Sequence, residues 1–289
     1  METPVFVRGL SRSGGTMLVT LLDAHPAISM AYELYPNLLS SDDDAWSATE
    51  MLKLLTEFPW SEALKKLQPN KIGIYLARCD RGGLSPDQVI DILRKFISDG
   101  LTFEDNPGRM EFMARCCRIK QESEATQLWG LKCAQAFNKY QAIWPNAFYL
   151  NIIRDGRDVL ASQLNTGAFN PDPANLAKGW CHTHLQFRKF SSQTGVKGIE
   201  VSYEKLVTNP EPETRRICDF LQLDFDESML NFYRQDLTIY SANHMSMAQI
   251  SKPLNTSKIG RWKTDVPKET LAAFLEIAGE TMSEFGYET

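Results

Sequence analysis

The chain has 289 residues, a length that suits one large α/β domain or two smaller ones. Hydrophobic residues make up 43% of it and charged residues 23%, which excludes a disordered or collagen-like protein. The 31 Lys and Arg against 36 Asp and Glu give a net charge of −5, so the overall field opposes nucleic acid and anionic membranes. An anionic ligand therefore needs a local basic pocket.

No stretch is apolar enough for a membrane helix, and the first residues lack the features of a signal peptide. We therefore expect a cytoplasmic protein without a membrane partner; the sequence carries no sign of its oligomeric state. The six cysteines include no C-x-x-C pair, which favours buried free thiols over a zinc site or a disulfide framework.

Strands and helices alternate along the chain. Val5–Arg8 is a short apolar run that ends in glycine, and helical spacing follows from Thr16. Further strands are expected at Leu128–Cys133, Ala147–Ile153 and Gly198–Ser202, and further helices at Gly156–Asn165, Glu211–Leu221 and Val266–Phe285. This alternation predicts one α/β, P-loop-like domain over residues 1–289, with a central parallel sheet flanked by helices.

Two segments depart from the alternation. Residues 40–125 have a helical pattern, with a helix start at Ser85-Pro86-Asp87-Gln88, and we expect a helical insertion there; the acidic run Asp42–Asp44 indicates an exposed break. Residues 235–263 show little periodicity, which is typical of a long functional loop.

A glycine-rich loop, Gly9–Thr16, joins the first strand to the first helix. Its glycines allow successive backbone N–H groups to face one anion at a helix N-terminus. The spacing matches the nucleotide-binding pattern G-x-x-x-x-G-K-[ST], except that Gly15 takes the place of the lysine and Arg12 could supply the charge. The loop predicts a phosphate site; an ordinary glycine-rich turn is the alternative.

A second basic motif, Arg154-Asp155-Gly156-Arg157-Asp158, directly follows the strand at Ala147–Ile153. Ligands of open parallel sheets bind at this end of a strand, so Arg154 and the later Ser162 could hold a second phosphate. A solvated charge cluster is the alternative.

Together the two motifs resemble the sulfotransferases that use 3′-phosphoadenosine 5′-phosphosulfate (PAPS) and release adenosine 3′,5′-bisphosphate (PAP). The family signatures R-S-G-T-T and R-D-G-R correspond to residues 12–16 and 154–157. The resemblance implies that Arg12, Ser13, Gly14, Gly15, Thr16 and Met17 hold the 5′-phosphosulfate, and that Arg154 and Ser162 hold the 3′-phosphate.

Three more segments are similar to the tyrosylprotein, Golgi-type branch of that family: residues 22–26 with the later Glu33, residues 201–207 with Tyr203, and residues 246–262. The resemblance adds Tyr203, Lys258, Gly260, Arg261 and Trp262 to the donor site. Two positions depart from the pattern: Gly15 replaces Thr or Ser, and Tyr32 replaces an acidic residue.

The resemblance also implies a mechanism, in which Glu33 is the general base and Lys132, Arg12 and Ser246 stabilise the charge that develops during an in-line displacement. No metal is required. We expect His244 to touch the acceptor, His25 to be structural, and His182 and His184 to point to different faces of one helix. The loop at 235–263 is expected to close over bound donor as a lid.

Two alternative functions stay open: a P-loop kinase that uses ATP and Mg²⁺, and a non-catalytic nucleotide-binding regulator. The acceptor could be the hydroxyl of a small molecule or of a peptidyl tyrosine, or an amine. Asp42–Asp44 follow the expected base and would repel an acidic peptide, which favours a small neutral or cationic acceptor.

Overall fold

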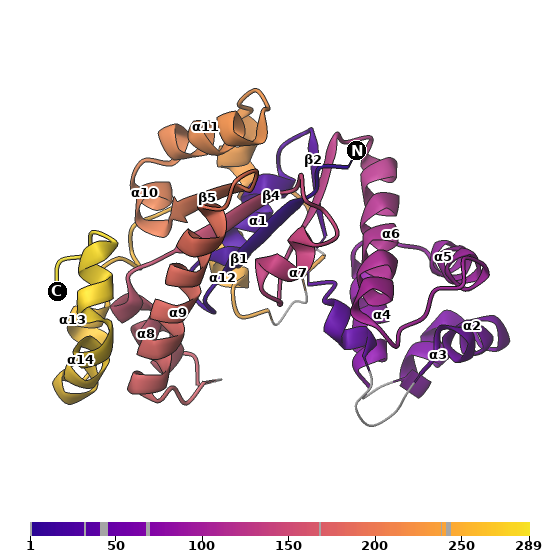
Figure 1. The fold of residues 1–289 in the computed structure, drawn as a ribbon, viewed down its shortest axis with the longest axis horizontal. Coiled ribbons are helices and arrows are strands. Elements are labelled where there is room, and N and C mark those ends of the chain that lie inside the picture. Colours follow the sequence, from indigo (N-terminus) through magenta and orange to yellow (C-terminus); the bar gives the residue numbers. More distant parts are fainter. Residues whose placement is uncertain are drawn as a thin grey trace.

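A sheet of five parallel strands forms the centre of the molecule (Figure 1). The computed structural model describes residues 2–31, 33–40, 46–67, 70–167, 169–237, 239–240 and 244–289. The strand order is β2-β3-β1-β4-β5, with all four neighbouring pairs parallel. The strands are β1 (Val5–Gly9), β2 (Ile28–Ala31), β3 (Leu128–Lys132), β4 (Phe148–Ile153) and β5 (Lys197–Ser202). This arrangement confirms the predicted α/β fold.

The central strand β1 is apolar because helices cover both of its faces. Val5 and Val7 pack with α1 (Gly15–Asp23) in one buried cluster, and Phe6 packs in another cluster on the opposite face. Side chains alternate along a strand, so Arg8 projects on the same face as Phe6.

The helices form three groups around the sheet. The α1 face also carries α10 (Tyr203–Thr208), α11 (Pro210–Leu221), η2 (Glu227–Arg234) and α12 (Met247–Ile250). The opposite face carries α6 (Asn106–Glu124), α7 (Phe137–Gln141) and α9 (Pro173–Ser191). A third cluster joins α9 to α8 (Gly156–Leu164), α13 (Trp262–Asp265) and α14 (Lys268–Glu284).

Between β2 and β3 the described chain is helical. It forms η1 (Pro36–Leu39), α2 (Ala48–Glu57), α3 (Trp60–Leu67), α4 (Lys71–Arg81), α5 (Pro86–Ser98) and α6. Ser85 and Gln88 cap the start of α5 reciprocally, as the sequence predicts. The domain limits stay a prediction, and Tyr32 and Asp42–Asp44 lie outside the described residues.

Two features were not predicted from the sequence. The edge strand β2 has only four residues, too few for a clear periodic pattern, yet it carries the chain to Glu33. The short helix α12 lies within 235–263, where we expected an irregular loop, and the short helix α13 begins at the end of that segment.

Candidate active site

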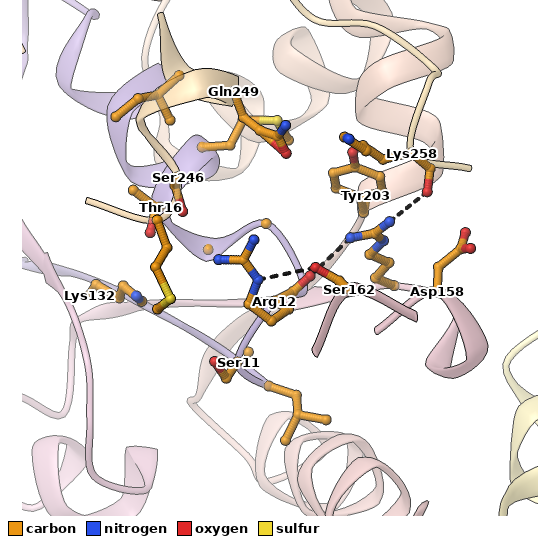
Figure 2. Close-up of a pocket in the computed structure, with 18 of the residues that line it drawn as sticks. Ser11, Arg12, Thr16, Lys132, Asp158, Ser162, Tyr203, Ser246, Gln249 and Lys258 are labelled. Carbon is orange, nitrogen blue, oxygen red and sulfur yellow. Dashed lines mark hydrogen bonds between the residues drawn. The ribbon is translucent and has the colours of Figure 1, made fainter. Parts of the chain in front are cut away.

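A cavity of about 610 Å³ lies at the carboxyl edge of the sheet, where ligands of parallel sheets bind. Its walls come from the loop after β1, from residues 132–134 after β3, from Arg154 after β4 and from residues 244–261 (Figure 2). The fold therefore brings the two predicted anion-binding motifs, 142 residues apart at Arg12 and Arg154, into one cavity.

The loop between β1 and α1 turns at Gly14. Its φ of 97° is in the left-handed region, and a Cβ there would lie 2.7 Å from the Tyr203 ring, so only glycine fits. Gly14, Gly15, Thr16 and Met17 line the cavity at the N-terminus of α1. The first backbone N–H groups of a helix have no partner within it, which makes this end a site for an anion.

Three cationic side chains meet above this loop: Arg12, Arg154 and Lys258. Burial, and then the charge of Arg154, lower the pKa of Arg12. Burial, together with Arg261, Arg154 and Arg12, lowers the pKa of Lys258. Cations that lie this close together favour an anionic ligand between them.

Arg154 is buried and held from several sides. Its Nη1 donates to the carbonyl oxygen of Arg12 at 3.0 Å, and its Nη2 donates to that of Lys258 at 2.5 Å. Its guanidinium lies 4.4 Å from the centre of the Tyr203 ring. Arg12, with a strained φ of 75°, donates from Nε to the Ser162 hydroxyl at 3.1 Å (Figure 2). The predicted 5′ and 3′ subsites are thus directly linked.

Glu33 and Lys132 form an ion pair on the cavity wall, with Nζ 3.1 Å from Oε1. Lys132 reaches this position under the glycine-rich loop, where a Cβ at Gly15 would lie 3.5 Å from its Cε. The second carboxylate oxygen of Glu33, Oε2, lies 3.2 Å from Nη2 of Arg78 on α4. The proposed base and the proposed stabilising lysine are therefore in direct contact.

The segment after residue 244 closes another side of the cavity. His244, Ser246, Lys258 and Arg261 line it, and the backbone N–H of Ser246 donates to Nδ1 of His244 at 3.2 Å. Burial lowers the pKa of His244; Lys132 and Arg12 add to this shift and Glu33 opposes it. Arg261 also pairs with Asp265 on α13.

Three residues of the predicted donor site do not line the cavity: Ser13, Gly260 and Trp262. Asp158 of α8 accepts the backbone N–H groups of Gly260 at 2.8 Å and Trp262 at 3.0 Å, and the Trp262 ring lies 4.1 Å from the Arg157 guanidinium. These contacts place the indole against α8, away from the cavity wall. Ser13 is fully buried beneath the loop, and its hydroxyl has no hydrogen-bond partner among the described residues.

Sequence reasoning missed four residues of this region: Arg8, Tyr35, Arg78 and Asp158. Asp158 belongs to the basic motif and could have been found there. A carboxylate this close in sequence to Arg154 and Arg157 indicates a residue with a hydrogen-bonding role at the same site. Arg78 has no local signal, since it lies in the helical stretch before β3 and meets Glu33 only through the fold.

Two further histidines, His25 and His184, have structural contacts. His25 lies 2.8 Å from the carbonyl oxygen of Asp224 through Nε2. His184 is buried on α9, lies 3.0 Å from the Asn151 amide, and has its pKa lowered to about 3, mainly by burial. All six cysteines are free thiols, and only Cys181 is partly exposed.

A family model described as the sulfotransferase family matches residues 4–227. The chain belongs to the sulfotransferase family. This confirms the predicted family and decides against the kinase alternative, because a kinase transfers a phosphoryl group and not a sulfuryl group.

Curated relatives span the whole chain. A putative protein-tyrosine sulfotransferase of Caenorhabditis briggsae is 25% identical over 300 residues, covering 100% of this chain and 90% of the relative. The human protein-tyrosine sulfotransferase 1 is 23% identical over 299 residues, covering 98% of this chain and 69% of the relative. These names agree with the predicted tyrosylprotein branch.

Solved structures share the fold of this sulfotransferase. The sulfotransferase domain of a Synechococcus olefin synthase superposes with a TM-score of 0.62 at 20% identity, over 100% of this chain and 97% of that domain. A mouse sulfotransferase complexed with PAP gives a TM-score of 0.51 at 11% identity, over 98% of this chain and 84% of the mouse one.

Among the described helices of this sulfotransferase, none is both long and apolar enough to cross a bilayer. The cytoplasmic location stays a prediction.

Proposed function

We propose that this sulfotransferase moves the sulfuryl group of PAPS to an acceptor hydroxyl, with Glu33 as the general base. The observation that carries the proposal is the group of Arg12, Arg154 and Lys258 next to the Glu33–Lys132 pair. PAPS carries charge at both its 5′ and 3′ positions, which suits cations spread along one cavity. The PAP complex of the mouse structure, which shares the fold, supports the same donor.

We assign the residues of the cavity to the two ends of the donor and to the reaction. The N-terminus of α1 and Arg12 face the 5′-phosphosulfate, and Arg154 with Lys258 faces the 3′-phosphate. PAPS supplies an activated sulfuryl group whose leaving group is the 5′-phosphate of PAP. Lys132 balances the negative charge that grows on that phosphate, while Glu33 takes the proton of the acceptor hydroxyl as the new S–O bond forms.

The acceptor side of the cavity carries one more cation. Arg8, Cys133, Ala134 and Thr183 line the cavity, and Arg8 projects on the sheet face opposite α1. Within the described ranges, the side chain of Arg8 has no hydrogen bond or ion pair. A partly buried guanidinium without a partner favours a carboxylate ligand. We therefore propose a phenolic acceptor of the tyrosine type, as the names of the relatives suggest. From Arg8 we infer that this acceptor carries an acidic group.

This proposal replaces the preference for a neutral or cationic acceptor, which rested on Asp42–Asp44 outside the described residues. It is tested with tyrosine peptides flanked by Glu or by Lys. The wild type should prefer the Glu peptide, and Arg8→Glu should reverse the preference while binding PAP normally. Equal use of both peptides by the wild type would contradict the acidic acceptor but not sulfuryl transfer itself.

The donor reaction is tested with radiolabelled PAPS and the Glu-flanked tyrosine peptide. Glu33→Ala and Lys132→Ala should each lower the transfer rate by about 10²-fold or more while keeping PAP binding. Arg94→Ala, on the exposed side of α5, is the control and should behave as wild type. PAP binding without transfer in the wild type would instead support the regulator alternative.

A further inference from the structure

Arg78 contacts both the backbone and the carboxylate of Glu33. Its Nη1 donates to the Glu33 carbonyl oxygen at 2.5 Å, and its Nη2 lies 3.2 Å from the carboxylate oxygen Oε2. The side chains of Arg78 and Glu33 are only 18% and 17% exposed, so water screens the pair weakly. A planar guanidinium can hold a backbone and a carboxylate oxygen at once, which an ammonium group cannot do with the same geometry.

The backbone conformation of Glu33 is one that requires stabilising contacts. Glu33 has a φ of 54°, in the left-handed region that non-glycine residues rarely adopt. Its carbonyl oxygen also accepts the backbone N–H of Tyr35 at 2.8 Å, which makes a tight turn between β2 and η1. Strained backbone of this kind persists when its surroundings fix it, and it occurs often at functional sites.

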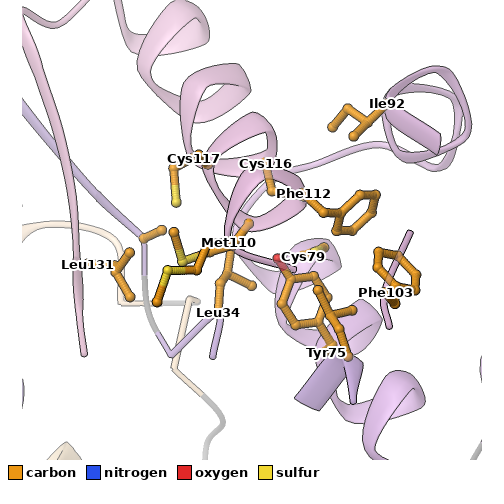
Figure 3. Close-up of a cluster of buried hydrophobic side chains, with 14 of the residues drawn as sticks. Leu34, Tyr75, Cys79, Ile92, Phe103, Met110, Phe112, Cys116, Cys117 and Leu131 are labelled. Atoms are coloured by element: carbon orange, nitrogen blue, oxygen red, sulfur yellow. The ribbon is translucent and has the colours of Figure 1, made fainter. Parts of the chain in front are cut away.

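A hydrophobic cluster packs together the segments that carry Glu33 and Arg78. Leu34, next to Glu33, and Cys79, next to Arg78, are buried in the same hydrophobic cluster, together with Tyr75 (Figure 3). Met110 and Phe112 of α6 complete this cluster and are fully buried. The helical stretch before β3 thereby presents Arg78 to Oε2 of Glu33, while Lys132 contacts Oε1.

The two cations on Glu33 have different surroundings. Lys132 lines the cavity and lies next to the glycine-rich loop, where the sulfuryl donor is proposed to bind. Arg78 does not line the cavity, and its guanidinium lies 5.2 Å from the Tyr35 ring. A donor anion would therefore compete with Glu33 for Lys132 but not for Arg78.

We propose that Arg78 is the positioning residue for the general base: it holds Glu33 in place when Lys132 turns to the donor. The inference rests on the proposed function of Glu33. Arg78 touches neither substrate, so it acts on the rate only through Glu33.

The test measures sulfuryl transfer from PAPS to the Glu-flanked tyrosine peptide in the full chain. Arg78→Ala should lower kcat by about 10²-fold, the loss typical of a displaced catalytic group, with peptide KM and PAP affinity within about threefold of wild type. Arg78→Lys should keep part of kcat, and added guanidinium chloride at millimolar concentration should restore part of the rate of Arg78→Ala but not of Glu33→Gln.

The double variant separates this role from a general structural one. Since Arg78 acts through Glu33, Glu33→Gln with Arg78→Ala should be no slower than Glu33→Gln alone. Additive losses, or a raised KM with unchanged kcat in Arg78→Ala, would overturn the inference. Thermal melting and PAP titration check that each variant is folded, and Arg94→Gln is the matched control. Wild type that binds PAP but transfers nothing would refute the proposed function, which is a distinct outcome.

Discussion

At the residue scale, Arg154 contributes most to the proposed 3′-phosphate site. It is 5% exposed, and it joins the glycine-rich loop to residue 258 through two backbone carbonyl oxygens. Hydrogen bonds to a charged group contribute about 1.5–3 kcal/mol, so Arg154→Gln should weaken PAP binding about 10- to 100-fold. ADP, which lacks a 3′-phosphate, should lose much less affinity, as calorimetry with both nucleotides would measure. An equal loss for both would place the 3′-phosphate elsewhere.

His244 gives the site a pH dependence with a definite sign. Its pKa is lowered from the usual 6.5 by burial and by Lys132 and Arg12, which a bound anion would neutralise. PAP binding should therefore raise the pKa of His244, and the affinity for PAP should rise as the pH falls and His244 becomes protonated. His244→Gln should remove this part of the dependence, measured as the difference between wild type and variant in proton uptake on binding. Identical uptake would contradict it.

At the scale of elements, Asp158 ties the late segment to α8. Its carboxylate accepts two backbone N–H groups, from Gly260 and Trp262, and these hydrogen bonds tie the segment to the helix. Asp158→Ala should make trypsin cleavage after Lys258, Arg261 and Lys263 about tenfold faster, because local opening becomes easier. Asp87→Ala on the exposed first turn of α5 is the control.

The same digestion tests the predicted lid. Saturating PAP should protect the wild type in this segment, and unchanged cleavage would count against closure over the donor.

The glycine-rich loop offers a matched pair of substitutions. Gly14→Ala should weaken PAP binding strongly, because the left-handed backbone and the Tyr203 ring at 2.7 Å both exclude a Cβ. Gly15→Ala should be tolerated, because its Cβ would make only ordinary contact with Lys132 at 3.5 Å. Titration with PAP compares the two, and equal losses would contradict this account of the turn.

Local patterns explain which elements were predictable. The strands β1 and β4 are short, mostly apolar runs, so the fold class followed from the sequence. The glycine loop is a local motif, and the phosphate site that it predicts stays a prediction. The contact of Arg78 with Glu33 joins residues 45 apart through a packed cluster, and no local pattern encodes it. Trp262 was placed at the donor by resemblance, whereas its backbone bond to Asp158 fixes it against α8.

At the scale of the whole molecule, the fold explains how an acidic protein can contain a basic cavity. The chain has a net charge of −5, yet Arg12, Arg154 and Lys258 come from distant parts of it to one cavity. The parallel sheet makes this possible, since the carboxyl ends of β1 and β4 lie side by side. The protein as a whole therefore repels polyanions such as nucleic acids, while one site can hold a small one.

The central claim is that this cavity is built for a nucleotide with a 3′-phosphate. Calorimetric titration of the wild type with PAP and with ADP, each with and without Mg²⁺, tests it most directly. We predict that PAP binds at least about tenfold more tightly than ADP and that Mg²⁺ changes neither affinity, since Arg154 and Lys258 supply the positive charge. Tighter binding of ADP, dependent on Mg²⁺, would contradict the account.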